Sequence, residues 1–463
     1  MFNASITLAS GATETVPVYW ANEFEFPILE LERRGRGRKG ETPDYYDAII
    51  TLDTETSKLT HWETQSTGER IEMVDGVWLY QWAIDFNGEI VAGRSVEDLG
   101  AFMKMAFDHY KLDSKHRMVW FVHNLSFDCT FWLNLLWKVF DGQVKLFATG
   151  QRRPIRITCG KGLELRCSYK LVNKGLDDWC EDAQPLHKKL VGSVDYSLIR
   201  TPRSTLTDTD WDYMINDIVC QRECLQDLMM TEKLRTVPMT ATGFVRRDMR
   251  KAAANDKHWH RRFLETLPTA KQYQLMQKAF VGGYTHCNSF ALGIWHNVRS
   301  FDAASMYPAV LATEKFPEGK WRWRRMHKLS DLEALCNEPD MACICEIYFD
   351  HIRLADKLTW NPYISSARCD IRGKFLLDNG KLISADSCRI AMTDIDYHII
   401  MEQYDFDWCA ILQVMECPKK PMPKWFIDTM REWYAKKTKL KGCDSFADKR
   451  RYNESKQRLN AIY

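Results

Sequence analysis

The sequence predicts a mixed α/β and α+β protein with several domains. Its 463 residues are enough for about two to four domains of roughly 100–200 residues each. Residues 46–52 and 118–122 are short apolar runs of the kind that forms buried strands. Residues 213–225 repeat apolar side chains at helical spacing, so strands and helices alternate in the first half of the chain.

The composition excludes several classes of protein. Hydrophobic residues make up 45% of the chain and aromatic residues 12%, which indicates buried cores rather than disorder. No run of about 18 apolar residues predicts a membrane span, and the first twenty residues lack the pattern of a secretory signal. The 15 cysteines are scattered and form no Cys-x-x-Cys pair, which is typical of a reduced intracellular protein without a structural zinc site.

Positive charge is concentrated near the end of the chain. The formal net charge is only +2, but residues 419–463 hold 13 Lys and Arg against 5 Asp and Glu, a net of +8. Such a segment is either a solvated helical face or a surface that faces the phosphates of nucleic acid. Charge alone does not decide between the two.

Two of the predicted strands end in carboxylate side chains. The run 46–52 leads into Asp53 and Glu55, which fall on one face because side chains alternate along a strand. The run 118–122 leads into a polar turn and then Asp128. An Asp-x-Glu pair by itself is more often an accident of the surface than a site.

The helical segment adds a carboxylate and a phenol. Tyr213 and Asp217 are four residues apart, so they stack on one helix face. Carboxylates are preferred ligands of Mg²⁺ and Mn²⁺, and two such ions about 3.5–4 Å apart catalyse phosphodiester hydrolysis. The phenol hydroxyl can orient the attacking water. The four carboxylates and the phenol therefore match the needs of a two-metal hydrolase.

In their order and spacing, these segments resemble the three motifs of 3′–5′ proofreading exonucleases of DnaQ or RNase H-like fold: Asp-x-Glu, Asn-x-x-Phe-Asp and Tyr-x-x-x-Asp. The resemblance implies that two Mg²⁺ or Mn²⁺ ions are bound by Asp53, Glu55, Asp128 and Asp217, and that Tyr213 positions the water. It also implies that the unpaired 3′ end of DNA is contacted by Thr56, Asn124, Phe127 and Ser168.

The second half of the chain resembles family B DNA polymerases. Phe280, Gly282 and Gly283 resemble the Tyr-x-Gly-Gly motif that links exonuclease and polymerase domains and touches the template strand, with Phe in place of Tyr. Paired glycines let a backbone approach DNA closely, although an ordinary turn before a strand is the alternative.

The string Asp302-Ala-Ala-Ser-Met-Tyr-Pro resembles polymerase motif A, and residues 298–302 then resemble the palm strand that precedes it. The resemblance implies that Asp302 binds the metal ion that activates the primer 3′-hydroxyl. It implies that the turn at Ser305 and Met306 cradles the triphosphate of a dNTP. Tyr307 would exclude the 2′-hydroxyl of a ribonucleotide.

The last residues resemble motif B, Lys-x-x-x-Asn-Ser-x-Tyr-Gly, with Lys456, Asn460 and Tyr463 on one helix face and Ala461 in place of Ser. Lys456 would hold the phosphates of the nucleotide, and Tyr463 would stack near the new base pair. On the preceding helix, Lys436 is either a DNA contact or a solvated side chain.

The sequence stops one residue before the closing Gly of motif B, so we expect the second palm Asp beyond it. Polymerisation would then need a missing C-terminal part. An interrupted gene, a two-subunit enzyme and an incomplete record all fit this break. The Asp-Thr-Asp of the third polymerase motif does occur at 208–210, but ahead of motif A, where we expect it to cap the helix that follows.

Residues 369–405 resemble part of the first insertion of protein-primed polymerases of small linear-genome phages, linear plasmids and organelles, which contacts a terminal protein. We therefore expect five regions. They are an unassigned N-terminal extension (1–47), the exonuclease domain (48–235), a linker with the first part of a palm (236–340), the insertion (341–425) and the start of the fingers (426–463).

We interpret the chain as the N-terminal portion of a protein-primed family B DNA polymerase with a 3′–5′ proofreading exonuclease. Its expected partners are primer–template and single-stranded DNA, dNTPs, a terminal protein and a complementary C-terminal polymerase chain, with no membrane. Its expected location is the host cytoplasm if the protein is viral. Two alternatives remain: a stand-alone exonuclease, and a non-catalytic subunit that binds the terminal protein or the complementary chain.

Overall fold

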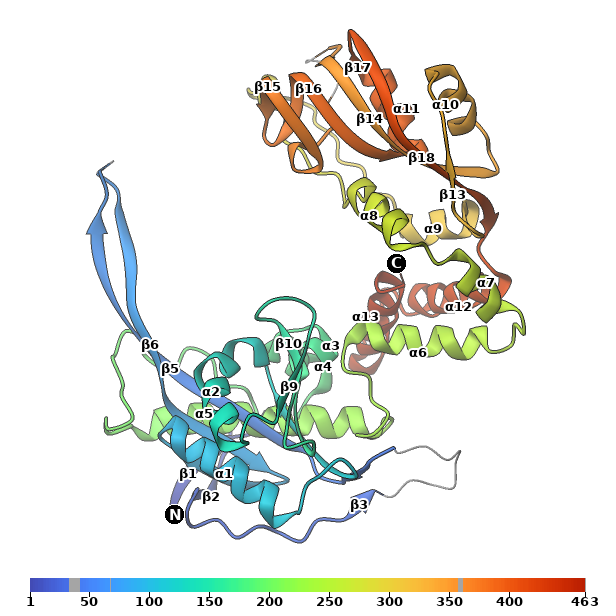
Figure 1. Cartoon of the computed structure of the whole chain (residues 1–463). Helices are drawn as coiled ribbons and strands as arrows, with labels where there is room; N and C mark the ends of the chain where they lie inside the picture. The colour runs from blue at the N-terminus through green and yellow to red at the C-terminus, as the bar shows by residue number, and fades with distance from the viewer. Residues whose placement is uncertain (33–41, 67, 357–360, 463) are drawn as a thin grey trace. The chain divides into compact units, whose positions relative to one another are not determined.

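The computed structural model describes residues 1–32, 42–66, 68–356 and 361–462, which form two compact units (Figure 1). Unit 1 comprises Met1–Asp248 and Lys436–Ile462, and unit 2 comprises Met249–Ala435. The boundaries fall within two helices, α6 (Ala241–Ala253) and α12 (Lys424–Lys439). The last helix of the chain therefore belongs to the same unit as the N-terminal residues, although the sequence analysis assigned it to the fingers.

An eleven-stranded sheet forms the centre of unit 1, with nine strands in the order β1-β2-β7-β6-β5-β8-β11-β10-β9. The β3–β4 pair joins this sheet through β8. The strands are β1 (Phe2–Thr7), β2 (Thr13–Trp20), β3 (Leu31–Glu32), β4 (Asp44–Tyr46), β5 (Ile50–Thr64), β6 (Arg70–Phe86), β7 (Glu89–Gly93), β8 (His116–Val122), β9 (Val144–Ala148), β10 (Pro154–Cys159) and β11 (Leu163–Cys167).

Helices cover both faces of this sheet, so unit 1 has three layers. Alternate residues of β8 show the division. Trp120 packs in the core that includes α1 and α2, while Phe121 packs in the core that includes α4 and α5. The helices of this unit, besides α6, are α1 (Val96–His109), α2 (Leu125–Val139), α3 (Ser168–Val172), α4 (Leu176–Ala183), α5 (Asp208–Met229) and α13 (Phe446–Asn460).

The N-terminal residues are part of the sheet rather than an extension from it. Strand β1 pairs with β2, and β2 continues the sheet by pairing in parallel with β7. Ile6 and Val18 are 2% and 0% exposed and pack against the apolar face of α5. On the other side of β7, β5 and β6 continue past their neighbours as a long two-stranded ribbon (Figure 1).

Helix α5 begins as the sequence predicts. Thr207 is its N-cap residue and forms a capping box with Asp210, in which each side chain bonds the backbone N–H of the other. This pairing satisfies donors that the first helical turn leaves without partners. The prediction that the Asp-Thr-Asp at 208–210 caps a helix is therefore confirmed.

Unit 2 is built on an antiparallel seven-stranded sheet. Strands β12-β18-β14-β16-β15 form its main path, with β13 paired to β18 and β17 to β14. Its strands are β12 (Lys315–Pro317), β13 (Arg322–Arg324), β14 (Met341–Leu354), β15 (Cys369–Asp378), β16 (Lys381–Thr393), β17 (Tyr404–Asp405) and β18 (Trp408–Pro421). Its helices, besides α12, are α7 (Trp259–Thr266), α8 (Ala270–Ala279), α9 (Met306–Thr313), α10 (Leu329–Cys336) and α11 (Asp394–Gln403).

One predicted strand is absent from unit 2. Residues 298–302 have no regular secondary structure, and Val298 and Phe301 are 77% and 87% exposed. A strand needs a partner for its backbone N–H and C=O groups. None of the described strands pairs with this segment, so the prediction of a palm strand here is wrong for this structure.

Among the described residues, no helix has the length and apolar character needed to cross a membrane.

Candidate active site

The four carboxylates predicted to bind metal come from three elements that meet in unit 1. Asp53 and Glu55 lie on β5, which pairs in parallel with β8, with Leu52 beside Val122. Strand β8 therefore ends next to Asp53 and delivers the start of α2, whose first turn holds Asp128. Helix α5, which carries Asp217, is joined to β5 where the Thr51 hydroxyl donates to the Ile218 carbonyl at 2.9 Å.

The carboxylates of this cluster repel one another when they are ionised. Burial and the nearby Asp128 raise the pKa of Asp53 to about 7. Burial, with the charges of Asp53 and Asp217, raises the pKa of Glu55 to about 9. Burial also raises the pKa values of Asp128 and Asp217 to about 7 each. The cluster therefore holds protons near neutral pH unless another positive charge replaces them.

Two neighbouring side chains hold individual carboxylates of the cluster in place. The Thr54 hydroxyl donates a hydrogen bond to Asp128, which is 3% exposed. The Lys189 ammonium donates to Oδ2 of Asp217 at 2.6 Å. The other Asp217 oxygen, Oδ1, is buried and has no hydrogen-bond partner among the described residues. Carboxylate oxygens are the ligands that hard divalent cations prefer, although no three of these four described residues bring ligand atoms within 4.8 Å of one another in this structure.

Lys189 was not predicted from the sequence. It lies between α4 and α5 in a segment without regular secondary structure, and no motif marks it. Its ammonium group also lies 5.3 Å from the centre of the Tyr213 ring. A single cation thus contacts both predicted catalytic residues of α5, Tyr213 and Asp217.

Tyr213 is held on α5 beside the carboxylates. Tyr196, another residue that was not predicted from the sequence, lies close enough to influence the pKa of Tyr213. Burial, and then the charge of Asp217, raises the pKa of Tyr213 above its usual range. The phenol therefore stays protonated and can act as a hydrogen-bond donor or acceptor, but not as a base.

Three of the four predicted DNA contacts surround this cluster. Thr56 directly follows Glu55, at a register shift in the pairing of β5 with β6. Asn124 is exposed and begins α2 in the left-handed conformation, with φ of 66°. Phe127 is 47% exposed and lies in the first turn of α2, next to Asp128. Their positions leave all three accessible to a strand that approaches the carboxylates.

The structure corrects the expectation for Ser168. Its side chain is 0% exposed, and its hydroxyl accepts a hydrogen bond from Gln221 at 2.9 Å. The same hydroxyl lies 3.0 Å from Nδ1 of His123, whose pKa burial lowers to about 4. Ser168 therefore cannot touch DNA in this conformation. It links the end of β8 to α5 behind the carboxylates.

The predicted polymerase residues in unit 2 are mostly exposed. Asp302 lies in the irregular segment before α9, and Ser305 is the N-cap of α9 in the left-handed conformation, with φ of 54°. Met306 and Tyr307 follow in the first turn of α9, 50% and 46% exposed. Phe280 ends α8 and is 74% exposed.

The predicted motif B residues lie in unit 1 instead. Lys456 and Asn460 are both exposed on α13, as their spacing predicts for one helix face. Tyr463 lies outside the described residues. The structure thus places the predicted nucleotide-binding residues in two units, and their joint site stays a prediction. The same holds for the DNA contacts expected of Gly282 and Gly283, which have open space around them, and of Lys436, which is exposed on α12.

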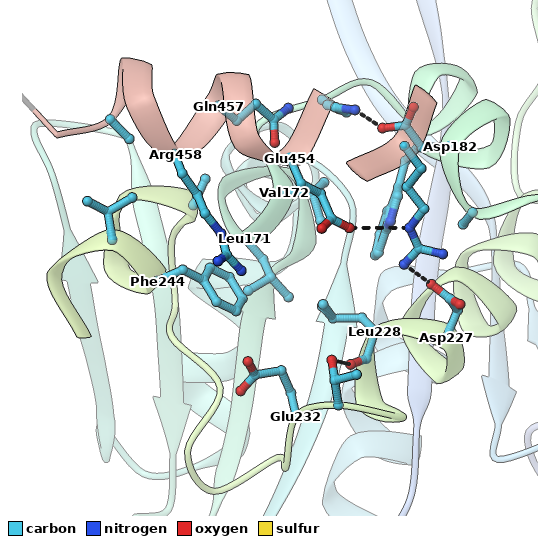
Figure 2. A pocket seen from close by; sticks show the side chains of 18 residues that line it. Leu171, Val172, Asp182, Asp227, Leu228, Glu232, Phe244, Glu454, Gln457 and Arg458 are labelled. Carbon is cyan, nitrogen blue, oxygen red and sulfur yellow. Dashed lines mark hydrogen bonds and ion pairs between the residues drawn. The ribbon is translucent and has the colours of Figure 1, made fainter. Parts of the chain in front are cut away.

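The face of α13 opposite Lys456 and Asn460 packs against the rest of unit 1 and closes a pocket of about 200 Å³ (Figure 2). Leu171, Leu228 and Phe244 supply apolar side chains to its wall. Arg450 of α13 forms ion pairs with Asp227 of α5 and, within α13, with Glu454. These contacts hold the last helix against the unit that carries the carboxylate cluster.

A separate group of metal-ligating side chains lies on the surface of unit 2. Asp350, His351 and Asp407 bring ligand atoms within 4.8 Å of one another. His351 and Asp407 are exposed, and Arg353 forms an ion pair with Asp407 at 2.9 Å. Each member therefore already has a charged neighbour, and this group carries no argument for a bound ion.

One family model matches more than half of the chain. The model of the organellar and viral type B DNA polymerases matches residues 198–463. No curated protein matches the chain. A solved structure of phi29 DNA polymerase with primer–template DNA and incoming nucleotides is 17% identical, with a TM-score of 0.58. A binary complex with primer–template DNA has a TM-score of 0.62, and one with single-stranded DNA has 0.61.

Each of these structural matches covers 90% of this chain and 67% of the phi29 chain. At 17% identity the likeness shows the fold alone. It confirms the predicted fold class, a mixed α/β multidomain protein with the fold of that polymerase.

Proposed function

The chain belongs to the organellar and viral type B DNA polymerases, and from that premise we propose that unit 1 is a 3′–5′ exonuclease. Its substrate is the unpaired 3′ end of a DNA strand, and its reaction is hydrolysis of the last phosphodiester bond. The observation that supports this most is the convergence of Asp53, Glu55, Asp128 and Asp217 from β5, α2 and α5. A buried oxygen without a partner, Asp217 Oδ1, adds to it.

The four carboxylates would hold two Mg²⁺ or Mn²⁺ ions, which supply Lewis-acid stabilisation of the attacking and leaving oxygens. The raised pKa values of the four groups agree with this role, because a divalent cation would replace the shared protons. Thr54 orients Asp128, and Lys189 opposes the rise that burial causes in the pKa of Asp217. Each of these contacts fixes a ligand before substrate arrives.

Tyr213 would orient the attacking water. Its hydroxyl lies beside Asp217 on the same helix face, and its raised pKa excludes a role as the base. The proton of the water passes instead to a carboxylate of the cluster or to solvent.

The unpaired strand would lie across the start of α2. Phe127 offers an exposed ring on which a base can stack, and Asn124 and Thr56 offer hydrogen-bonding groups on either side of the carboxylates. A duplex presents no free base face to such a ring, so these contacts favour a frayed end.

Family membership supports a second activity, DNA-directed DNA synthesis. Asp302 would bind metal at the polymerase site, with Ser305, Met306, Tyr307, Lys456, Asn460 and Tyr463 around the incoming dNTP. Phe280, Gly282, Gly283 and Lys436 would contact primer–template DNA. A terminal protein is proposed as a partner of residues 341–425 on their sequence resemblance alone.

The exonuclease proposal is tested with a 5′-labelled single-stranded oligonucleotide and Mg²⁺. We expect a ladder of progressively shorter products from the wild-type chain. Asp128→Asn should slow product formation by about 10²–10³-fold, because one metal ligand loses its charge. Asp302→Asn is the matched control, since it removes a carboxylate from unit 2. Equal rates for wild type and Asp128→Asn would overturn the proposal.

A further inference from the structure

A second, positively charged pocket lies at the edge of the unit 1 sheet. It has a volume of about 440 Å³ and is formed by the start of β8 with β9 and β10. Four basic residues line it, Arg117, Lys145, Arg156 and Lys161, together with Phe147. None of the described residues that line it is acidic. We call these five residues the basic pocket.

A buried carboxylate organises its arginines. Glu164 on β11 is 0% exposed and accepts from Arg117 at 2.7 Å and from Arg166 at 2.6 Å. Arg156 lies 3.9 Å from the same carboxylate. Burial opposes the charge of Glu164, but the three guanidinium groups outweigh it and leave the pKa of Glu164 below its usual range. One negative charge thus holds three positive charges, and the excess is positive.

Two donors in the basic pocket have no partner. The Nε atoms of Arg117 and Arg156 are both buried and make no hydrogen bond among the described residues. An anionic oxygen is the acceptor that guanidinium groups prefer, and the side chains of Arg117 and Arg156 are 25% and 27% exposed. The exposed Lys145 and Lys161 add mobile charges at the rim.

An aromatic ring accompanies these charges. Phe147 is 51% exposed on β9, and the guanidinium carbon of Arg156 lies 5.9 Å from the centre of its ring. Proteins that bind single-stranded nucleic acid combine such rings, on which bases stack, with cations that follow the phosphates. Duplex DNA offers phosphates but no free base to stack.

The basic pocket is separate from the carboxylate cluster. Arg117 is the second residue of β8, whereas the cluster lies beyond its last residue, Val122. At about 3.3 Å per residue, the seven residues of β8 separate the two ends by about 20 Å. A ligand in the basic pocket therefore does not occupy the exonuclease site.

We propose that the basic pocket is a second binding site for single-stranded DNA, which holds the strand at a distance from the 3′ end under hydrolysis. The proposal rests on the proposed function, because it assigns the pocket to the same nucleic-acid substrate. It predicts that affinity depends on strand length, since only a long strand reaches both sites.

Binding is measured first, in chelator so that no DNA is cleaved, by fluorescence anisotropy of a labelled oligonucleotide of about 20 nucleotides. Lys145→Gln combined with Lys161→Gln should weaken binding about 5- to 10-fold and reduce the slope of log K against log salt by about 1.4, because each phosphate contact in a single strand contributes about 0.7. Phe147→Ala should weaken the single strand more than a duplex of equal length.

The matched control is Lys104→Gln with Lys138→Gln, which removes two lysine charges from α1 and α2. It should change the affinity and the salt slope less than half as much. If the two double variants weaken binding equally, or if the variant at Lys145 and Lys161 leaves the slope of log K against log salt unchanged, the basic pocket is only a solvated face. Equal loss of single-strand and duplex binding in Phe147→Ala would overturn the assignment to single strands.

Cleavage then separates this proposal from the exonuclease proposal. With Mg²⁺, the double variant Lys145→Gln/Lys161→Gln should raise KM for the long strand about 5-fold or more. It should leave kcat and the cleavage of a trinucleotide unchanged. If wild type cleaves neither substrate, the exonuclease proposal fails and the binding result still decides the pocket. If the double variant at Lys145 and Lys161 slows trinucleotide cleavage as much as that of the long strand, the pocket proposal fails.

Discussion

At the scale of residues, the carboxylate cluster is a set of like charges that the fold holds together. Asp53 lies on β5, Asp128 lies in the first turn of α2, which follows the neighbouring parallel strand β8, and Asp217 lies on α5. Lys189 is the cation that contacts this set directly. Without metal, the cluster opposes folding whenever its members are ionised.

The sign of the pH dependence follows from the raised pKa values. In the unfolded chain these carboxyls have pKa values of about 4, whereas in the folded chain the values are about 7 for Asp53, Asp128 and Asp217 and about 9 for Glu55. The neutral forms favour the folded state, so their stabilisation is present below about pH 4 and is lost as pH rises toward 9.

We therefore expect Asp128→Asn to raise the melting temperature of the metal-free chain near pH 8, because it removes one of the repelling charges. A gain of about 1 kcal/mol corresponds to about 2–4 °C for a unit of this size. Mg²⁺ should stabilise wild type more than the variant. Circular dichroism melting with and without Mg²⁺ measures both, and an Asp128→Asn variant that melts lower without metal would contradict the account.

Lys189 provides a second prediction at this scale. Lys189→Gln removes the charge that limits the rise in the pKa of Asp217, so this pKa should rise further. The acidic limb of the exonuclease pH–rate profile should then move to higher pH, with a lower rate at neutral pH. Lys188→Gln is the matched control, because Lys188 is the adjacent exposed lysine. Identical profiles for the two variants would argue against the role of Lys189.

At the scale of elements, local patterns in the sequence predicted the parts that local physics determines. The run ending at Val122 forms the end of β8, and the last three residues of the run before Asp53 begin β5, because short apolar segments favour buried strands. The capping box at Thr207 is likewise a short-range feature. Strand β5 and helix α5 carry Asp53, Glu55 and Asp217, and Asp128 lies on α2, shortly after β8.

Long-range pairing explains what the sequence did not predict. Strands β1 and β2 join the sheet only through β7, about seventy residues later in the chain, and no pattern within residues 1–47 marks that partner. Lys189 lies outside any helix or strand, and its role in the site comes from its contact with Asp217. The palm strand at 298–302 was predicted from a motif, but a strand forms only where another strand accepts it.

Ile6→Ala tests whether the N-terminal strands are integral to unit 1. Ile6 is 2% exposed between β1 and α5, so we expect the free energy of unfolding to fall by about 2–5 kcal/mol. Thr15→Ala, at an exposed position of β2, should cost less than about 0.5 kcal/mol. Urea titration of the two variants measures the difference in their free energies of unfolding. Equal values would mean that β1 contributes nothing to the hydrophobic core.

At the scale of the whole molecule, the chain is not divided into units in a simple linear order. Unit 1 takes its sheet from the first half of the sequence and α13 from the end, so both termini of the described chain belong to one unit. The carboxylate cluster and Asp302 lie in different units. Hydrolysis and synthesis are therefore expected to respond to separate sets of substitutions.

The most direct test of the account replaces one nonbridging oxygen of the terminal phosphodiester by sulfur. If ions held by Asp53, Glu55, Asp128 and Asp217 contact this phosphate, one diastereomer should be hydrolysed about 10²-fold more slowly with Mg²⁺. Mn²⁺, which accepts softer ligands, should restore the rate. Equal cleavage of both diastereomers with Mg²⁺, or a slow diastereomer that Mn²⁺ leaves slow, would contradict the two-metal site.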